Sequence, residues 1–175
     1  MKTVSLLPVA ILGLLSGCAG FGTPSPKAPS RTEVVFDHPE NFRDVKDESS
    51  PTEKGTAYIL SQLREFLEDR ATSALPEGYH LKVVFTDIDL AGDFEPWRGP
   101  EWSNVRIVKA IYPPAFKFSY TVTDASGKVV REGNEDIRDL SFDTRITPDP
   151  SDRLHYEKSI LEDWVHSKLQ GLKQS

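Results

Sequence analysis

The chain has 175 residues, with 27 acidic and 21 basic side chains and a formal net charge of −6 at pH 7. This acidic balance argues against nucleic acid as a partner and against electrostatic attraction to anionic lipid headgroups. The single cysteine excludes an internal disulfide and a cysteine-based metal site. The length suits one domain with a substantial hydrophobic core.

The N-terminus is typical of a bacterial lipoprotein signal peptide. Lys2 precedes an apolar stretch over residues 4–15, and Leu15-Ser16-Gly17-Cys18 has the small residues of a lipoprotein cleavage site. The stretch has about 12 residues, whereas a membrane-spanning helix needs roughly 20. We therefore expect cleavage before Cys18 and lipidation of its thiol, which would hold the protein firmly on a bilayer. Ala19 in the second mature position resembles the outer-membrane sorting pattern of enteric bacteria, so we expect a lipid anchor on the periplasmic face of that membrane.

Residues 19–31 read AGFGTPSPKAPSR and are dominated by Gly, Pro, Ser and Ala. This composition is typical of an extended tether. The predicted organisation is a signal peptide over residues 1–17, a lipidated cysteine and flexible tether over residues 18–31, and a single domain over residues 32–175.

The domain is predicted to begin with a strand over residues 32–37 and a helix that follows it. Ser50 is a favourable N-cap for this helix, Pro51 suits its first turn, and Glu53 completes an S-x-x-E capping box. Apolar residues recur at helical spacing from there to residue 74. Residues 76–78 (Pro-Glu-Gly) end the helix.

The second predicted strand covers residues 81–90. Strict alternation puts two sets of apolar side chains on opposite faces, as in a central strand: Leu81, Val83 and Phe85 on one, and Val84, Ile88 and Leu90 on the other. After a loop, residues 102–110 are predicted as a third strand.

Residues 116–123 alternate apolar and polar side chains and predict a fourth strand, and a turn leads to a fifth over residues 128–137. Asp149 with Pro150 predicts the start of the last helix. The order β-α-β-β-β-β-α predicts an α+β fold. We expect a two-layer sandwich with a mixed, mostly antiparallel sheet, two helices on one face and the other face partly open.

An acidic cluster near the end of the second strand is the first candidate site. Asp87 and Asp89 lie two residues apart, so they share a strand face, and Asp93 and Glu95 follow in the loop. Such carboxylates can bind Ca²⁺ or act as an acid–base pair. The calcium-loop pattern fails at two ligand positions, however. The alternative is a solvated strand end whose carboxylates pair with Arg98 or Arg106.

The second candidate site is the aromatic loop that contains Phe94, Trp97, Arg98 and Trp102. Trp and Arg supply much of the binding energy at protein interfaces, and aromatic rings stack on sugars. In the alternative interpretation, Trp97 folds back onto the core and Arg98 pairs with Glu95 or Glu101.

Several runs of sequence resemble the domain-of-unknown-function family 3016. They are FTDIDLAGDFEPWRG (85–99), VRIVKAIYPPAFKFSYTVTDASGKVVREG (105–133), IRDLSF (137–142) and LHYEKSILEDW (154–164). The resemblance implies an exported, single-domain protein of the Gram-negative envelope and brings no catalytic residue or cofactor with it. In layout alone, the domain is similar to envelope-assembly lipoproteins such as the lipopolysaccharide-assembly lipoprotein, which is a fold analogy only.

The sequence contains no complete catalytic motif, and we expect no cofactor. The leading hypothesis is therefore an outer-membrane-anchored, non-enzymatic binding or envelope-assembly module whose partner is another envelope protein. One alternative is a cell-wall hydrolase or saccharide-binding enzyme, with Asp87 or Asp89 as acid or base and Trp97 as a stacking platform. Another is a calcium-stabilised binding domain that uses Asp87, Asp89 and Asp93.

Overall fold

The computed structural model describes residues 30–47, 50–146 and 149–174. The predicted signal peptide, the lipidation site Cys18 and nearly all of the predicted tether lie outside these residues. Ser30 and Arg31, the last two residues of that tether, contact the first helix: Arg31 Nη2 donates a hydrogen bond of 2.8 Å to the carbonyl oxygen of Thr72.

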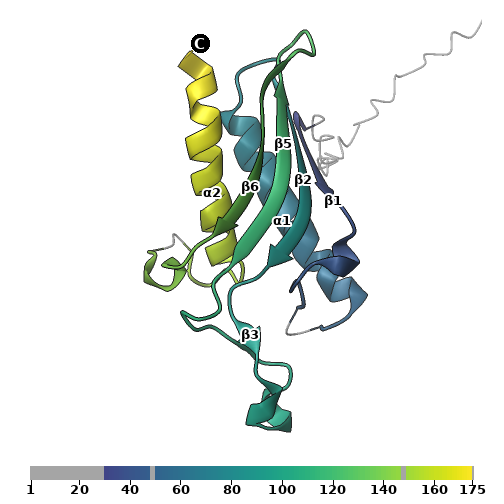
Figure 1. Cartoon of the computed structure of the whole chain (residues 1–175), viewed down its shortest axis with the longest axis vertical. Helices are drawn as coiled ribbons and strands as arrows, with labels where there is room; N and C mark the ends of the chain where they lie inside the picture. Colours follow the sequence, from purple (N-terminus) through teal and green to yellow (C-terminus); the bar gives the residue numbers. More distant parts are fainter. Residues whose placement is uncertain (1–29, 48–49, 147–148, 175) are drawn as a thin grey trace, which may run out of the picture.

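The main sheet has four strands in the order β1-β2-β5-β6 (Figure 1). They are β1 (Thr32–Phe36), β2 (His80–Asp89), β5 (Ala115–Thr123) and β6 (Val129–Arg138). β1 is parallel to β2, and the other neighbours are antiparallel. The helices α1 (Glu53–Ala74) and α2 (His155–Leu169) pack together on one face of this sheet. The structure thus confirms the predicted α+β sandwich.

The prediction of a strand over residues 102–110 is wrong. Only β4 (Arg106–Ile107) forms there, and it pairs with β3 (Asp93–Phe94) in a separate two-stranded sheet. Two short 3₁₀ helices, η2 (Pro96–Arg98) and η3 (Pro100–Trp102), lie between them. β2 has β1 on one edge and β5 on the other, so no free edge remains beside it for another strand. The connection over residues 91–112, here called the arm, instead projects beyond the end of the sheet (Figure 1).

A β-bulge changes the alternation of β2. Leu81, Val83 and Phe85 share one face, as predicted, and are buried under the helices, but the register shifts between Phe85 and Asp87. As a result Ile88 is also buried, and its predicted position on the opposite face is wrong.

Both predicted helix starts need correction. The N-cap of α1 is Thr52 rather than Ser50, and its side chain accepts a hydrogen bond from the backbone N–H of Gly55. α2 begins at His155, later than predicted, because Asp149 caps a local turn instead, where it accepts a 3.0 Å hydrogen bond from Ser151 N. Both predictions chose the first acceptable polar side chain in a segment that contains several.

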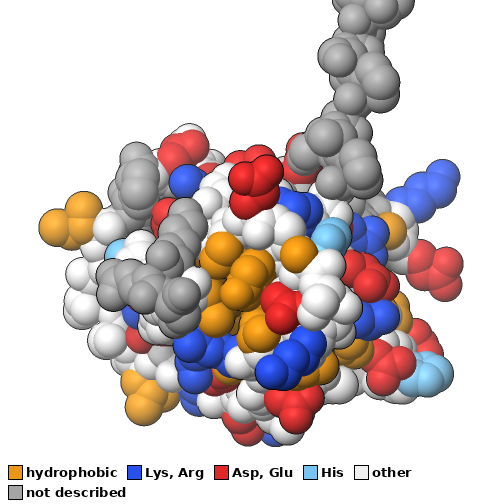
Figure 2. Space-filling model, turned by 90° about the horizontal axis from the view of Figure 1, so that it is seen from above, with side chains coloured by type: hydrophobic (Ala, Val, Ile, Leu, Met, Phe, Trp, Pro, Cys, Tyr) orange, Lys and Arg blue, Asp and Glu red, His pale blue; other side chains and the backbone are white. Residues whose placement is uncertain are grey.

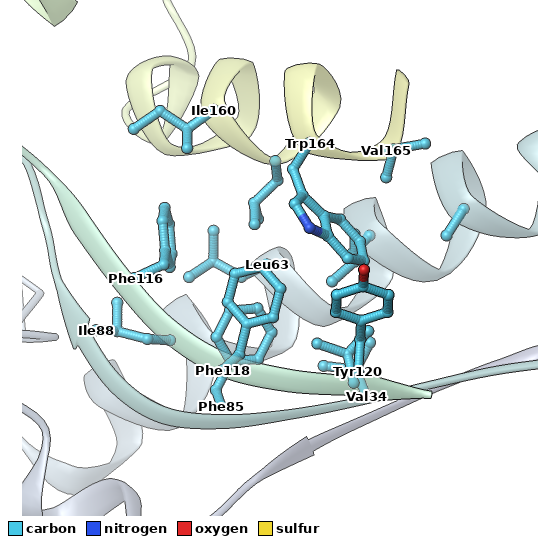
Figure 3. Packing of buried hydrophobic residues seen from close by; sticks show 14 of the residues in the cluster. Val34, Leu63, Phe85, Ile88, Phe116, Phe118, Tyr120, Ile160, Trp164 and Val165 are labelled. Atoms are coloured by element: carbon cyan, nitrogen blue, oxygen red, sulfur yellow. The ribbon is translucent and has the colours of Figure 1, made fainter. Parts of the chain in front are cut away.

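The core lies between the sheet and the two helices (Figure 3). Aromatic rings connect the layers: the ring centroids of Phe85 and Phe118 are 4.9 Å apart, and those of Phe118 and Trp164 are 5.0 Å apart. Tyr120 packs edge-on against Trp164 at 5.3 Å. A Cβ at Gly133 of β6 would lie 3.0 Å from the Tyr120 ring, so this glycine is required by a close approach.

No helix of the described part of the chain covers the opposite face of the sheet, as predicted for a partly open face, and most of its side chains are polar. Cross-strand ion pairs cover it, including Lys82–Glu33 at 3.2 Å and Lys117–Asp136 at 3.3 Å. The end of the molecule opposite the arm shows a small hydrophobic cluster among charges of both signs (Figure 2). Within the described ranges, no helix has the length and apolar character needed to cross a bilayer.

Gly55 generates a stability prediction, because it is buried at the start of α1. A Cβ at this position would lie 1.8 Å from the backbone oxygen of Ser50. We expect Gly55→Ala to lower the free energy of unfolding by about 1–3 kcal/mol, although alanine normally stabilises helices. The measurement is chemical denaturation. Ala57→Gly at an exposed position of the same helix is the control and should cost about 1 kcal/mol. Stabilisation by Gly55→Ala would contradict the close approach.

Candidate binding site

Arg106 fixes the base of the arm to the rest of the domain. Its Nη1 lies 2.9 Å from Asp44 Oδ2 and donates a 3.1 Å hydrogen bond to the carbonyl oxygen of Gly92. Its Nη2 donates a 3.0 Å hydrogen bond to the carbonyl oxygen of Lys46. The guanidinium carbon also lies 4.7 Å from the centroid of the Phe94 ring, within range of a cation–π interaction. The side chain thus connects both strands of the arm to the loop before α1.

Further out, the arm is organised around one buried carboxylate. Glu95 is only 2% exposed, and its Oε1 lies 2.5 Å from Lys109 Nζ and accepts a 2.9 Å hydrogen bond from the Tyr112 hydroxyl. Arg98 Nε donates to its Oε2. The Lys109 hydrogen bond, together with those from Arg98 and Tyr112, outweighs desolvation and lowers the pKa of Glu95 to about 2. Glu95 is therefore ionised at neutral pH and connects η2, through Arg98, to the turn that contains Lys109 and Tyr112.

The arm presents large apolar side chains to solvent. Trp97 is 72% exposed and Trp102 is 40% exposed, and the arm also exposes Val105, Val108 and Ile111. The alternative in which Trp97 folds back onto the core is wrong, while its second part, pairing of Arg98 with Glu95, is confirmed. The predicted loop residues therefore have two roles. Trp97, Arg98 and Trp102 are accessible to a partner, whereas Phe94 is half-buried beneath Arg106 and supports the arm.

The acidic cluster is held by arginines other than the predicted ones. Arg43 contacts both acidic residues of β2: its Nη2 lies 3.4 Å from Asp87 Oδ2 and its Nη1 lies 3.1 Å from Asp89 Oδ2. Arg138 approaches Asp89 at 3.9 Å. The predicted pairing with Arg98 or Arg106 is therefore wrong for Asp87 and Asp89, whereas Glu95, the last carboxylate of the predicted cluster, does pair with Arg98. Burial, opposed by Arg43, raises the pKa of Asp89 above its ordinary value.

Asp93 does not join these two carboxylates. Its Oδ1 accepts a 2.7 Å hydrogen bond from the backbone N–H of Phe94, and its side chain is exposed on the arm. In the part of the chain that the structure describes, no group of three or more His, Cys, Asp or Glu side chains is placed to hold a metal ion. The geometry of Asp87, Asp89 and Asp93 therefore lends no support to the calcium hypothesis.

A cavity of about 520 Å³ separates the inner side of the arm from the end of the main sheet. Arg43, Asp89 and Arg138 supply its charged wall, and Phe94 and Tyr112 supply aromatic surface from the arm. The exposed tryptophans and this cavity make the arm the most structured candidate for a binding surface.

Sequence reasoning identified Trp97 and Arg98 but missed the charge network that positions them. Lys109 and Tyr112 are 14 and 17 residues from Glu95, so no local spacing links the three. The only usable signal was the concentration of acidic and basic residues in a segment that also contains several aromatic residues.

Comparison with known proteins identifies the family. Residues 30–167 match the family described as "Protein of unknown function (DUF3016)", and the chain belongs to it. No curated protein and no solved structure matched the chain.

The Glu95 network predicts a pH-dependent order of the arm. Because the folded-state pKa of Glu95 lies below its ordinary value, its stabilising contribution is present above pH 4.5 and is lost as the pH falls towards 2. Glu95→Gln should therefore increase amide hydrogen exchange in the arm at pH 7. The difference from the wild type should shrink as the pH falls through this range.

Glu101→Gln is the matched control, since Glu101 is an exposed carboxylate on the same arm. It should leave exchange in the arm unchanged. Equal effects of the two substitutions, or a Glu95 effect that persists unchanged in acid, would argue against the network.

Proposed function

We propose that this DUF3016 protein is a binding or envelope-assembly module whose arm contacts another protein of the Gram-negative envelope. The observation that carries the proposal is Trp97, which is 72% exposed at the end of a segment held by ion pairs to the buried carboxylate of Glu95. Trp and Arg are enriched among the residues that dominate binding energy, and Arg98 lies beside Trp97. An exposed tryptophan on an ordered support can bind with little loss of conformational entropy.

The charge of the arm favours a protein partner. Residues 91–112 contain three acidic side chains (Asp93, Glu95, Glu101) and three basic ones (Arg98, Arg106, Lys109), so the arm is formally neutral. A neutral surface with exposed apolar side chains matches the core of a protein interface, which is depleted in charge and enriched in aromatic residues. It offers no concentration of positive charge for nucleic acid.

The open face of the sheet is the less favourable surface. Ion pairs cross this face between neighbouring strands, as in Lys82–Glu33 and Lys117–Asp136, and a partner would have to desolvate them. The arm requires less desolvation of charge, so we assign the interface to the arm.

We also propose that the module is held on the periplasmic face of the outer membrane through lipidated Cys18. The support comes from the sequence: an apolar stretch too short to span a bilayer, followed by Leu-Ser-Gly-Cys. A diacylglyceryl group with a further acyl chain provides more than the two anchoring signals needed for stable membrane attachment. A tether between anchor and domain would let the arm reach a neighbouring protein.

The interface assignment predicts the result of photo-cross-linking in cells. A photoreactive amino acid at position 102 should form an adduct with a defined envelope protein. Trp97→Ala, which leaves the Glu95 contacts in place, should abolish this adduct and weaken binding of the purified partner roughly 30-fold or more, the loss expected for a hot spot. Tyr58→Ala removes an exposed aromatic ring from α1 and serves as the control, which should retain the adduct. An adduct unchanged by Trp97→Ala would refute the assignment.

The anchor predicts a change of fractionation. Wild-type protein should sediment with membranes and have a mass that includes acyl groups. Cys18→Ser should be released to the soluble fraction without acyl mass, because a hydroxyl at this position is not a substrate for lipidation. Membrane sedimentation that persists in Cys18→Ser, with no acyl mass on the wild type, would contradict lipid anchoring.

A further inference from the structure

The strand β6 forms a free edge of the main sheet. It is the last strand in the order β1-β2-β5-β6, and among the described residues no strand pairs with its outer side (Figure 1). It has ten residues, whereas β1 at the other edge has five. β6 contains no proline, and a long edge strand of this kind is a template for pairing with another chain.

The hydrogen bonds to β5 indicate which backbone groups of β6 point outwards. Asp139 N donates a 3.2 Å hydrogen bond to the carbonyl oxygen of Pro114, one position beyond the pair Ala115–Arg138. Hydrogen-bonded and non-hydrogen-bonded pairs alternate in an antiparallel ladder, so the odd-numbered residues over 131–137 bond to β5. The N–H and C=O groups that point outwards are therefore those of Glu132, Asn134, Asp136 and Arg138.

Two opposite charges lie at equal distances on either side of Gly133, on the side of the sheet that faces the helices. Arg131 donates a hydrogen bond to the carbonyl oxygen of Lys168, and among the described residues it has no carboxylate partner. Glu135 Oε1 lies 2.8 Å from Lys168 Nζ. A guanidinium has five N–H donors and a carboxylate has two oxygens, so each group can contact a further partner. This arrangement makes the edge complementary to a second copy of itself.

An antiparallel copy of β6 pairs favourably when the two-fold axis passes through Gly133. Arg131 of each copy then lies opposite Glu135 of the other, and Glu132 lies opposite Asn134. The outward backbone groups of the two strands face each other in this register, and both pairs of helices lie on the same side of the joined sheet. Opposite charges at directly opposed positions stabilise an antiparallel pair.

The charge pattern disfavours the other registers that bring the outward backbone groups together. An axis through any charged residue of β6 places that residue opposite its own copy. An axis through Asn134 places Glu132 opposite Asp136, and an axis through Ile137 places Glu135 opposite Asp139. Like charges at opposed positions destabilise a strand pair, so the register centred on Gly133 is selected.

The helix layer leaves room for the second copy. Trp164 of α2 packs against Phe118 and Tyr120 of β5, the strand inside β6. In the joined sheet, β5 and its copy are three strand spacings apart, about 14 Å. Helices pack with their axes about 8–10 Å apart, so two α2 helices fit side by side. A groove of about 370 Å³ between β6 and α2 has Glu135 in its lining and can receive Arg131 of the second copy.

We propose that this chain forms a two-fold dimer in which the β6 edges pair antiparallel about Gly133 and join two four-stranded sheets into one. The second copy is the partner because the charges of the edge are complementary to themselves in that register. The interface is independent of the arm, since it uses residues 129–138 and the neighbouring side of α2. Antiparallel pairing would place the two arms at opposite ends of the joined sheet.

A charge exchange tests the register. Sedimentation velocity of the full chain in detergent should show a dimer whose proportion rises with concentration. Arg131→Glu and Glu135→Arg each place like charges opposite each other twice, and each should raise the dissociation constant at least about 10-fold. An equal mixture of the two variants should form dimers again, because opposite charges then face each other at both contacts.

Lys54→Glu is the matched control, since it makes the same change of charge at an exposed position at the start of α1 and should leave the dimer unchanged. A wild-type chain that stays monomeric up to millimolar concentration would overturn the proposal. Dimers that persist in both single variants would overturn the register. So would a mixture of the two that stays monomeric while circular dichroism shows each variant folded.

Residue-resolved amide hydrogen exchange tests the backbone pairing. In the dimer, the amides of Glu132, Asn134 and Asp136 should be protected, and Arg131→Glu should remove this protection. The amides of Gly133 and Glu135, which bond to β5, should stay protected in both proteins. A dimeric sample in which the three outward amides exchange freely would place the contact elsewhere on the molecule and overturn the proposal.

Discussion

The position of the arm depends on one guanidinium group. Arg106 binds Asp44, two backbone carbonyl groups at the ends of separate segments, and the face of Phe94. Its side chain and that of Asp44 are both largely buried, at 12% and 14% exposure. Loss of one partner from such a pair leaves a poorly solvated charge, which typically costs about 3–5 kcal/mol.

Electrostatic contacts take over in the arm the role that hydrophobic burial has in the sandwich. β3 and β4 each contain two residues, and an isolated two-stranded sheet of this size is not stable in water. The Glu95 carboxylate compensates by joining Arg98, Lys109 and Tyr112. Because the apolar side chains are not needed for an internal core, Trp97 and Trp102 remain available at the surface. The proposed binding surface is therefore ordered without a partner, which lowers the entropy cost that binding would carry.

The sequence predicted those parts of the structure that depend on local periodicity. The alternation of β5 and the helical spacing of α1 depend only on residues that are close in the sequence. Both elements lie where these patterns predicted them. Residues 102–110 have a strand-like pattern as well, but the edges of β2 are occupied, and only the complete sheet shows this. The bulge after Phe85 is a similar case, since one inserted residue reverses the face of all that follow. The burial of Glu157, which is 1% exposed in α2, could have been predicted from local spacing. The residue lies three positions after Leu154 and four before Leu161, on the apolar stripe of the helix.

The acidic pair of β2 shows that residue spacing alone can suggest a catalytic or metal site that the observed contacts do not support. Asp87 and Asp89 do share a face, and burial of Asp89 raises its pKa, which is one property of a general acid. A general acid must also deliver its proton to a substrate, yet Arg43 contacts both carboxylates and its backbone N–H donates to Asp87 at 2.9 Å. These contacts connect the loop after β1 to the end of β2. An isolated β-bridge between Asp44 and Asp89 lies directly beside them, just before the arm begins. The contacts of the pair are those of a structural cross-link, and they place these aspartates among the residues that position the arm.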